Sequence, residues 1–123
     1  MKRVTGIGGI FFKCKDPDAL RDWYAKHLGI PVDEGGYVTF AWGEEKGHTV
    51  WSPFEADTDY FAPSKRDFLI NYRVEDLDAV LRALRDEGVE VEDKTEDGEF
   101  GKFGWLMDPE GNKIELWQPP ENF

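Results

Sequence analysis

The sequence predicts a single α+β domain made of two consecutive modules, each with the order strand, helix and about three strands. Three observations support this prediction. The chain repeats itself, each half holds one amphipathic helix pattern, and turn residues divide the segment after each helix into short extended pieces. The whole chain of 123 residues fits one compact domain over 1–123.

The repeat is visible when the two halves of the chain are aligned. Residues 10–20 match residues 70–80 in chemical type at most positions. The Trp-x-Pro ending at 51–53 matches the one at 117–119. Such self-similarity indicates two copies of one structural unit. The matches predict two modules at 4–53 and 66–119, joined by a connector at 54–65.

Each module opens with an apolar, β-branched and aromatic segment, which is typical of a strand. These segments cover 4–15 and 67–75, and each is followed by an aspartate that can cap a helix, Asp16 or Asp76. An apolar stripe at helical spacing then runs to a glycine, which is a common helix terminator. The stripes are Leu20, Trp23, Tyr24 and Leu28 before Gly29, and Leu77, Val80, Leu81 and Leu84 before Gly88.

The segments after each helix are short and extended, and turn residues separate them. Turn signals occur at 35–36 and 45–47 in the first module, and at 97–98 and 108–112 in the second. They leave room for about three strands after each helix. The predicted order in each module is therefore βαβββ.

Composition excludes several classes of protein. Fifteen Lys and Arg against 26 Asp and Glu give a net charge of −11, which repels the phosphate backbone of nucleic acids. No apolar stretch approaches the roughly 20 residues that cross a bilayer, so no membrane partner is expected. The single cysteine, Cys14, suits a reducing compartment, and a cytoplasmic location is predicted. The aromatic content of 15%, with five Trp, must fill a core, a pocket or an interface.

A family resemblance comes from the end of the second module. Residues 108–116 read Asp-Pro-Glu-Gly-Asn-Lys-Ile-Glu-Leu, and 74–79 read Val-Glu-Asp-Leu-Asp-Ala. A tandem βαβββ repeat with this ending resembles the glyoxalase, bleomycin-resistance and extradiol-dioxygenase superfamily, also called vicinal oxygen chelate proteins. The resemblance implies a curved, mostly antiparallel, eight-stranded sheet around a central cleft, often within a homodimer. It does not choose among isomerases, epimerases, dioxygenases, thiol transferases and drug binders.

The resemblance also implies four positions for a divalent metal, one on the first and one on the last strand of each module. In this sequence they are Gly9, Thr49, Leu69 and Glu115. A catalytic divalent ion normally needs about three protein ligands, and Glu115 alone is a strong one. No metal or other cofactor is therefore predicted. We hypothesise that a salt bridge from Lys13 or Arg73 to Glu115 replaces the ion.

Alternation along the strands separates a core face from a mixed face. Ile70, Tyr72, Ile114 and Leu116 suit packing under the helices, whereas the opposite face mixes polar and aromatic side chains. Aromatic area with a few polar groups is the makeup of a small-molecule site. Glu115 is the candidate catalytic proton carrier or ligand anchor. The candidate ligand-binding residues are Phe11, Lys13, Thr49, Trp51, Asn71, Arg73, Trp105 and Trp117.

The leading functional prediction is a protein that binds a small aromatic or planar organic ligand in the cleft without the usual catalytic metal. The alternative is a metal-dependent lyase, isomerase or dioxygenase that uses Glu115 and His48, and the sequence leaves open whether any reaction is catalysed. A third interpretation is a dimerisation module whose cleft is filled by its own side chains. Tyr60 and Phe61 of the connector are expected to shield a pocket or a dimer seam. The expected partners are a small molecule and a second copy of the chain.

Overall fold

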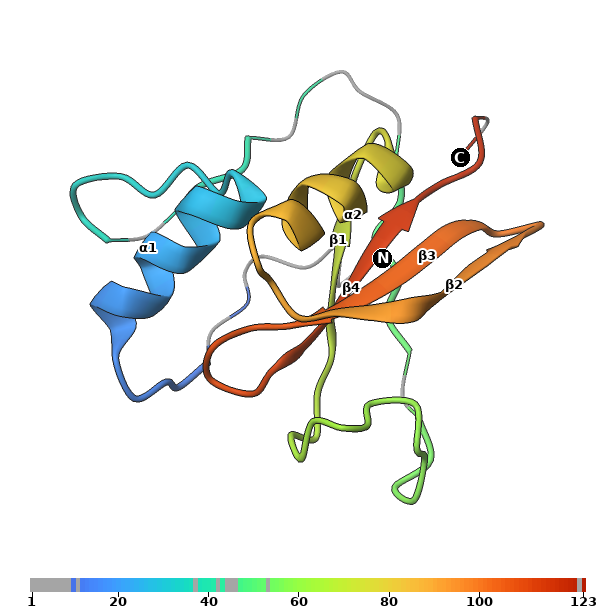
Figure 1. Cartoon of the computed structure of the whole chain (residues 1–123), viewed down its shortest axis with the longest axis horizontal. Helices are drawn as coiled ribbons and strands as arrows, with labels where there is room; N and C mark the ends of the chain where they lie inside the picture. The colour runs from blue at the N-terminus through green and yellow to red at the C-terminus, as the bar shows by residue number, and fades with distance from the viewer. Residues whose placement is uncertain are drawn as a thin grey trace, which may run out of the picture.

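A computed structural model describes residues 10, 12–36, 38–41, 43, 47–52, 54–121 and 123. In these residues the chain forms two helices and a single four-stranded sheet, so the fold is α+β (Figure 1). In chain order the elements are α1 (Pro17–Leu28), β1 (Ile70–Arg73), α2 (Leu77–Asp86), β2 (Val91–Gly98), β3 (Gly101–Met107) and β4 (Lys113–Gln118).

The sheet is mixed and has the strand order β1-β4-β3-β2. β1 pairs with β4 in parallel, and β3 pairs antiparallel with both β4 and β2. The last strand in the chain is therefore a central strand, flanked by the first and the third. This is the order strand, helix and three strands that the sequence predicts for the second module.

The described residues before 54 differ from the prediction. Among them α1 is the one regular element, and residues 10 and 12–15, expected in the opening strand, are not in a strand. The mostly antiparallel eight-stranded sheet is thus not seen in the described part of the chain. A strand is stabilised by hydrogen bonds to a neighbouring strand, and the pairs found here all lie within the second module.

Both helices begin at the predicted caps. The side chain of Asp16 accepts a hydrogen bond from the backbone amide of Ala19, at 3.1 Å, and Asp76 accepts one from Ala79 at the same distance. These caps satisfy amides that have no partner inside the first turn of a helix. α1 ends at Gly29, whose φ of 65° lies in the left-handed region that glycine adopts without strain.

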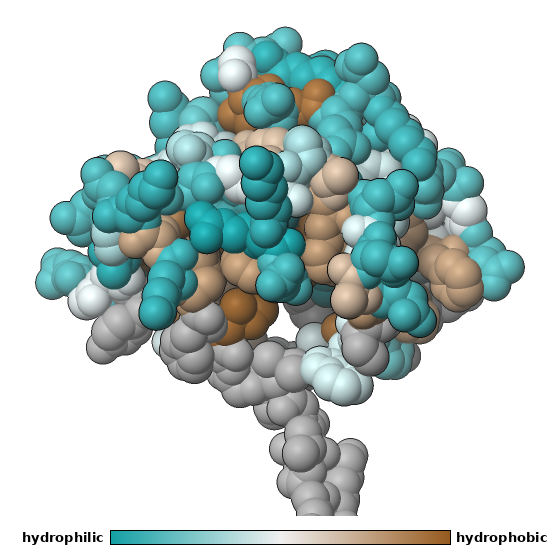
Figure 2. All heavy atoms as spheres, turned by 90° about the horizontal axis from the view of Figure 1, so that it is seen from below, coloured by the Kyte–Doolittle hydropathy of each residue, from teal (hydrophilic) through white to brown (hydrophobic). Residues whose placement is uncertain are grey.

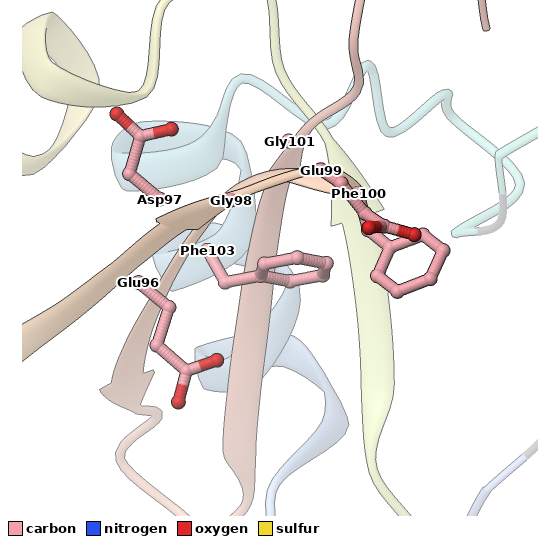
Figure 3. A pocket seen from close by; sticks show the side chains of 7 residues that line it. All are labelled: Glu96, Asp97, Gly98, Glu99, Phe100, Gly101 and Phe103. Atoms are coloured by element: carbon pink, nitrogen blue, oxygen red, sulfur yellow. The ribbon is translucent and has the colours of Figure 1, made fainter.

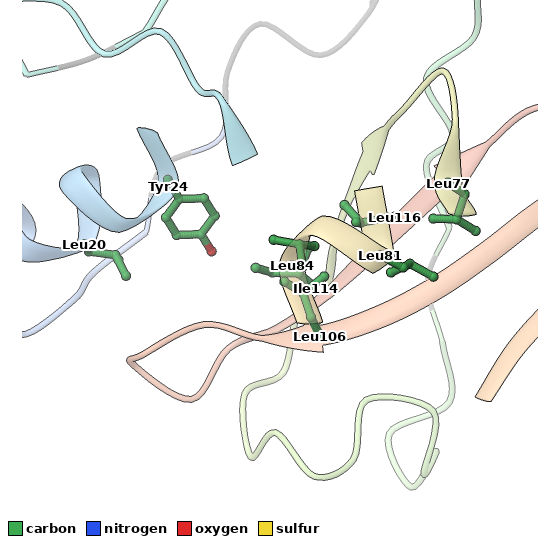
Figure 4. Close-up of a cluster of buried hydrophobic side chains, with 8 residues drawn as sticks. All are labelled: Leu20, Tyr24, Leu77, Leu81, Leu84, Leu106, Ile114 and Leu116. Atoms are coloured by element: carbon green, nitrogen blue, oxygen red, sulfur yellow. The ribbon is translucent and has the colours of Figure 1, made fainter. Parts of the chain in front are cut away.

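The core lies between α2 and one face of the sheet (Figure 4). Leucines of α2 face apolar side chains of β3 and β4, and each such buried side chain stabilises the fold by roughly 1.5–3 kcal/mol. α1 adds Leu20 and Tyr24 at the edge of this cluster. The buried members from α2 and the sheet are Leu77, Leu81, Leu84, Leu106, Ile114 and Leu116.

The turn between β3 and β4 attaches α1 to the sheet. The Tyr24 hydroxyl donates to a carboxylate oxygen of Asp108 at 2.8 Å, and Asp108 also accepts from the backbone amides of Glu110 and Asn112. The Glu110 carboxylate in turn accepts from the amides of Lys15 and Asp16, at 3.2 Å each. The signature segment therefore closes a hairpin and holds the start of the first helix at once.

The surface agrees with the high share of charged residues, 33% of the chain. The side seen in Figure 2 is mainly hydrophilic, with apolar side chains in small patches. Several large apolar side chains of the first module are exposed in the structure, among them Phe40, Val50 and Trp51. None of the described helices is long and apolar enough to cross a membrane.

Replacing Gly104 with alanine should destabilise the fold, because α2 approaches β3 closely at this residue. A Cβ atom there would lie 2.9 Å from Cδ1 of the buried Leu81. We expect Gly104→Ala to lower the free energy of unfolding by about 1–3 kcal/mol in urea denaturation. Gly98→Ala is the control, since a Cβ atom at that residue would meet nothing within 4 Å and its change should stay within about 0.5 kcal/mol. Equal effects of the two substitutions would contradict the close approach.

Replacing Tyr24 with phenylalanine should weaken the attachment of α1 and change the alkaline stability. Loss of a hydrogen bond to a carboxylate is expected to cost about 1.5–3 kcal/mol. Burial raises the pKa of the Tyr24 hydroxyl, with smaller contributions from Tyr72 and Asp108. Above pH about 10 the unfolded chain releases this proton first, so the free energy of unfolding falls as the pH rises. Urea titrations between pH 8 and 11 should show a shallower decline for Tyr24→Phe than for the wild type, and parallel declines would refute the assignment.

Candidate functional site

The predicted site residues of the second module gather on the face of the sheet opposite α2. In the first row across the strands, Asn71 of β1 pairs with Glu115 of β4, which pairs with Trp105 of β3. In the next row, Arg73, Trp117 and Phe103 occupy the same three strands. We call these six residues the polar-aromatic face. Their common side confirms the predicted alternation.

The Glu115 carboxylate lies at the centre of this face. The residue is 7% exposed, and its oxygens accept hydrogen bonds from three donors. Trp105 Nε1 donates at 3.1 Å, Asn71 Nδ2 donates at 3.0 Å, and the Tyr60 hydroxyl donates to the same oxygen as Trp105. A buried carboxylate is costly unless it is hydrogen-bonded, and these donors offset that cost.

The donors around Glu115 are all neutral, which differs from the hypothesised salt bridge. None of the ion pairs among the described residues includes Glu115. Lys13 is exposed, and Arg73 Nη1 donates instead to the backbone carbonyl of His48 at 3.3 Å. The physical reason is the register of the sheet, because it places Asn71 and Trp105 directly beside Glu115, and Arg73 beside Trp117.

The connector covers the Glu115 row. The Tyr60 ring packs edge-on against Trp105, with 6.1 Å between ring centroids, and Trp105 is 2% exposed. Lys113 of β4 holds the connector there, since its ammonium group donates to the backbone carbonyls of Tyr60 and Ala62 at 2.9 and 3.0 Å. In Figure 1 the connector lies on the other side of the sheet from α2. Burial and the hydrogen bond to Glu115 raise the pKa of the Tyr60 hydroxyl.

The Trp117 row forms a small aromatic stack with a cation at its edge. The Trp117 ring stacks on Phe103 at 6.1 Å and 11°, and the Arg73 guanidinium lies 5.5 Å from its centroid. The indole Nε1 donates to the carbonyl of Phe100 at 2.8 Å, which fixes the orientation of the ring. Asn71 and Arg73 on the edge strand β1 are exposed, whereas Trp117 is 7% exposed.

The predicted site residues of the first module that the structure describes are exposed. Lys13 and Thr49 are exposed, and Trp51 is 78% exposed. The His48 ring packs against Phe123 at 4.3 Å. Phe11 lies outside the described residues, as do Gly9 and Trp42.

Two residues that contact the Glu115 row, Tyr60 and Lys113, were not among the predicted site residues. Tyr60 is a direct partner of Glu115, although the sequence indicated only that it shields a pocket or a seam. Lys113 holds Tyr60 in place. Its position could have been found from alternation, because it precedes Glu115 by one full period on the same strand.

The residues at the family's metal positions do not fit a divalent ion. Leu69 has no ligand atom in its side chain, and Thr49 is exposed. Both oxygens of Glu115 already accept hydrogen bonds. In the described part of the chain, no group of three or more His, Cys, Asp or Glu side chains is placed to hold a metal ion.

A hollow of about 390 Å³ lies at the hairpin between β2 and β3 and shares Phe103 with the polar-aromatic face (Figure 3). Its lining contains none of the residues predicted to bind a ligand. Phe100 and Phe103 contribute rings, while Glu96 and Asp97, which are consecutive in β2, point to opposite sides of the strand (Figure 3). The hollow thus lies at the hairpin beside the Trp117 row, and the candidate site remains the polar-aromatic face.

The βαβββ order and the Asp-Pro-Glu-Gly-Asn turn before a glutamate-bearing last strand are those of a glyoxalase, bleomycin-resistance and dioxygenase superfamily protein. A family model described as a glyoxalase-like domain matches residues 9–117. The chain therefore belongs to that family. The comparison with curated proteins found no match.

Solved structures support the fold. TnmS3, described as an antibiotic binding protein from a Streptomyces species, is 23% identical over 98% of this chain and 100% of its own, with a TM-score of 0.62. A protein from the mobile metagenome of V. Pseudocholerae is 18% identical over 96% of this chain and 97% of its own, with a TM-score of 0.58. A superfamily member from Sphaerobacter thermophilus is 28% identical, but the match spans only 40% of each chain, with a TM-score of 0.37. The first two matches cover nearly the whole chain.

Substitutions of Glu115 should show that its acceptor atoms stabilise the fold. Glu115→Met keeps the size of the side chain but leaves the Trp105 indole and the Tyr60 hydroxyl without an acceptor, so we expect a loss of about 1–3 kcal/mol. Glu115→Gln is the matched control, because its carbonyl oxygen still accepts from both and the Asn71 amide can rotate to pair with its NH₂ group. The measurement is urea denaturation at pH 7. A methionine variant as stable as the glutamine variant would show that the donors do not depend on residue 115.

Proposed function

We propose that the protein binds a small, planar aromatic molecule against the polar-aromatic face. The observation that carries this proposal is the grouping of Phe103, Trp105 and Trp117 on one face around a single buried carboxylate. Aromatic area for affinity with a few polar groups for orientation is the makeup of small-molecule sites. On this proposal Glu115 anchors the ligand, and Arg73 and Asn71 at the exposed edge orient its polar groups.

A binding role is also supported by one structural relative. TnmS3, which covers 98% of this chain, is described as an antibiotic binding protein. The metal-dependent alternative has no such support from the contacts, since the His48 ring packs against Phe123 while Glu115 bonds Tyr60, Asn71 and Trp105. We therefore favour binding over metal-dependent lyase, isomerase or dioxygenase chemistry.

We further propose that the first module completes the site as the second half of an eight-stranded sheet. Phe11, Lys13, Thr49 and Trp51 would then form the opposite wall of the cleft, within one chain or across a homodimer. The exposure of Phe40, Val50 and Trp51 supports this arrangement, because large apolar side chains of one module are commonly buried by association. A cytoplasmic location stays a prediction.

Titration with planar aromatic compounds tests the proposed function. Anthraquinone-2-sulfonate and 2-naphthol should shift the indole N–H resonances of Trp105 and Trp117 in ¹H–¹⁵N NMR spectra. Trp117→Leu should weaken binding by about 2- to 10-fold, the range measured for aromatic pairs. Arg82→Ala, at an exposed position of α2 across the sheet from this face, should not change it. EDTA should leave the affinity unchanged, since the proposed contacts involve no metal.

Three outcomes would contradict the proposal. If neither compound moves any tryptophan resonance, the face is filled by the protein's own side chains and the binding proposal fails. If the shifts are confined to other tryptophans, the ligand binds elsewhere. If EDTA abolishes binding, a metal belongs to the site.

A further inference from the structure

The connector supplies one side chain that has the chemistry of a small aromatic ligand. Tyr60 presents a planar ring edge-on to Trp105, and its hydroxyl donates to Glu115. It comes from neither a helix nor a strand. These are the two contacts that a bound phenol would make on this face.

We infer that the preferred ligands are planar aromatic molecules with a neutral hydroxyl donor. Such a ligand displaces the Tyr60 hydroxyl from Glu115. This inference rests on the proposed function. The Tyr60 side chain is then an internal substitute that occupies the site in the free protein. The ligand class is thus a planar phenol or a related aromatic alcohol, which the fold alone does not define.

The hydrogen bonds of Glu115 argue for a neutral donor. Its described partners, Tyr60, Asn71 and Trp105, are all uncharged groups that donate hydrogen bonds to its oxygens. A ligand carboxylate or sulfonate in the place of the Tyr60 hydroxyl would put two negative charges within hydrogen-bond distance. Like charges at that distance disfavour each other strongly in a site shielded from water. A neutral hydroxyl restores the lost bond instead.

Lys113 does not reverse this preference. Its ammonium group donates to the carbonyls of Tyr60 and Ala62 and pairs with the Glu92 carboxylate at 3.3 Å. It lies 5.5 Å from the Trp105 centroid. The positive charge is therefore already matched by a carboxylate and two carbonyl oxygens, and it remains an anchor for the connector backbone.

The anchoring also explains how the Tyr60 side chain can leave while the connector stays. Lys113 holds backbone carbonyls, whereas the hydroxyl of Tyr60 is the only group of its side chain bonded to the sheet among the described hydrogen bonds. In the structure the Tyr60 ring also packs against Phe54 and Phe61, at 5.4 and 6.3 Å, and its centroid lies 5.6 Å from the Lys113 ammonium group. A ligand thus competes with these ring contacts and with one hydrogen bond.

A ligand can bind only those molecules in which the Tyr60 side chain has left the site. The apparent affinity therefore equals the intrinsic affinity multiplied by the fraction of protein with an open site. Tyr60→Phe keeps the ring but removes its bond to Glu115, so it should raise the open fraction. We expect 2-naphthol to bind this variant about tenfold more tightly than the wild type, by calorimetry at pH 7. Tyr72→Phe is the matched control. It removes a hydroxyl from the core face of β1, which Glu115 does not contact, and should leave the affinity unchanged.

The donor itself is tested with 2-methoxynaphthalene, which has the same ring system but no hydroxyl hydrogen. It should bind about tenfold more weakly than 2-naphthol to both proteins. The Trp105 indole resonance provides a direct signature, because Trp105 and Tyr60 donate to the same oxygen of Glu115. Tyr60→Phe should shift that resonance, and 2-naphthol, but not 2-methoxynaphthalene, should return it toward its wild-type position.

The experiments distinguish the displacement of Tyr60 from the binding of planar rings to the face. Equal binding of the two naphthalenes, or an unchanged 2-naphthol affinity in Tyr60→Phe, would overturn the role of Tyr60 while the face still binds planar rings. No binding of either compound to either protein, with no shift at Trp105 or Trp117, would overturn both proposals.

Discussion

The burial of a carboxylate on the central strand is the constraint on which the candidate site depends. Glu115 sits on β4, between β1 and β3, where water cannot solvate its charge. A charge in that position persists only if donors surround it, and they come from both neighbouring strands and from the connector. The same interaction therefore aligns the Trp105 ring, ties Asn71 to the sheet and places Tyr60 over the face.

A second buried carboxylate repeats this arrangement at the end of the hairpin. Asp108 gathers the Tyr24 hydroxyl and the backbone of its own turn, and so attaches α1 to the sheet. The connector and α1 are thus joined to the sheet through acceptors on β4 and on the turn that precedes it. Carboxylates bonded to neutral donors make both joints, and at the connector the buried ammonium group of Lys113 adds hydrogen bonds to two backbone carbonyls.

The contacts of Glu115 distinguish this face from the four-ligand metal site that the resemblance implies. The glutamate at the last family position remains, and its described neighbours are hydrogen-bond donors from Tyr60, Asn71 and Trp105. Functions are set by such local substitutions on a shared scaffold. A face of three aromatic rings with one hydrogen-bonded acceptor is suited to recognition of a planar molecule.

The sequence alone determined the features that depend on local periodicity. The caps Asp16 and Asp76, the βαβββ order of the second module and the common face of Asn71, Glu115 and Trp105 all follow from helix or strand repeats, which each segment carries within itself. Only the tertiary structure decided which groups donate hydrogen bonds to the Glu115 carboxylate. Alternation shows that a side chain faces inward, but the partner of a buried charge depends on register and on which distant segment folds over it. Here sheet register paired Arg73 with Trp117, and the connector brought Tyr60 to the carboxylate.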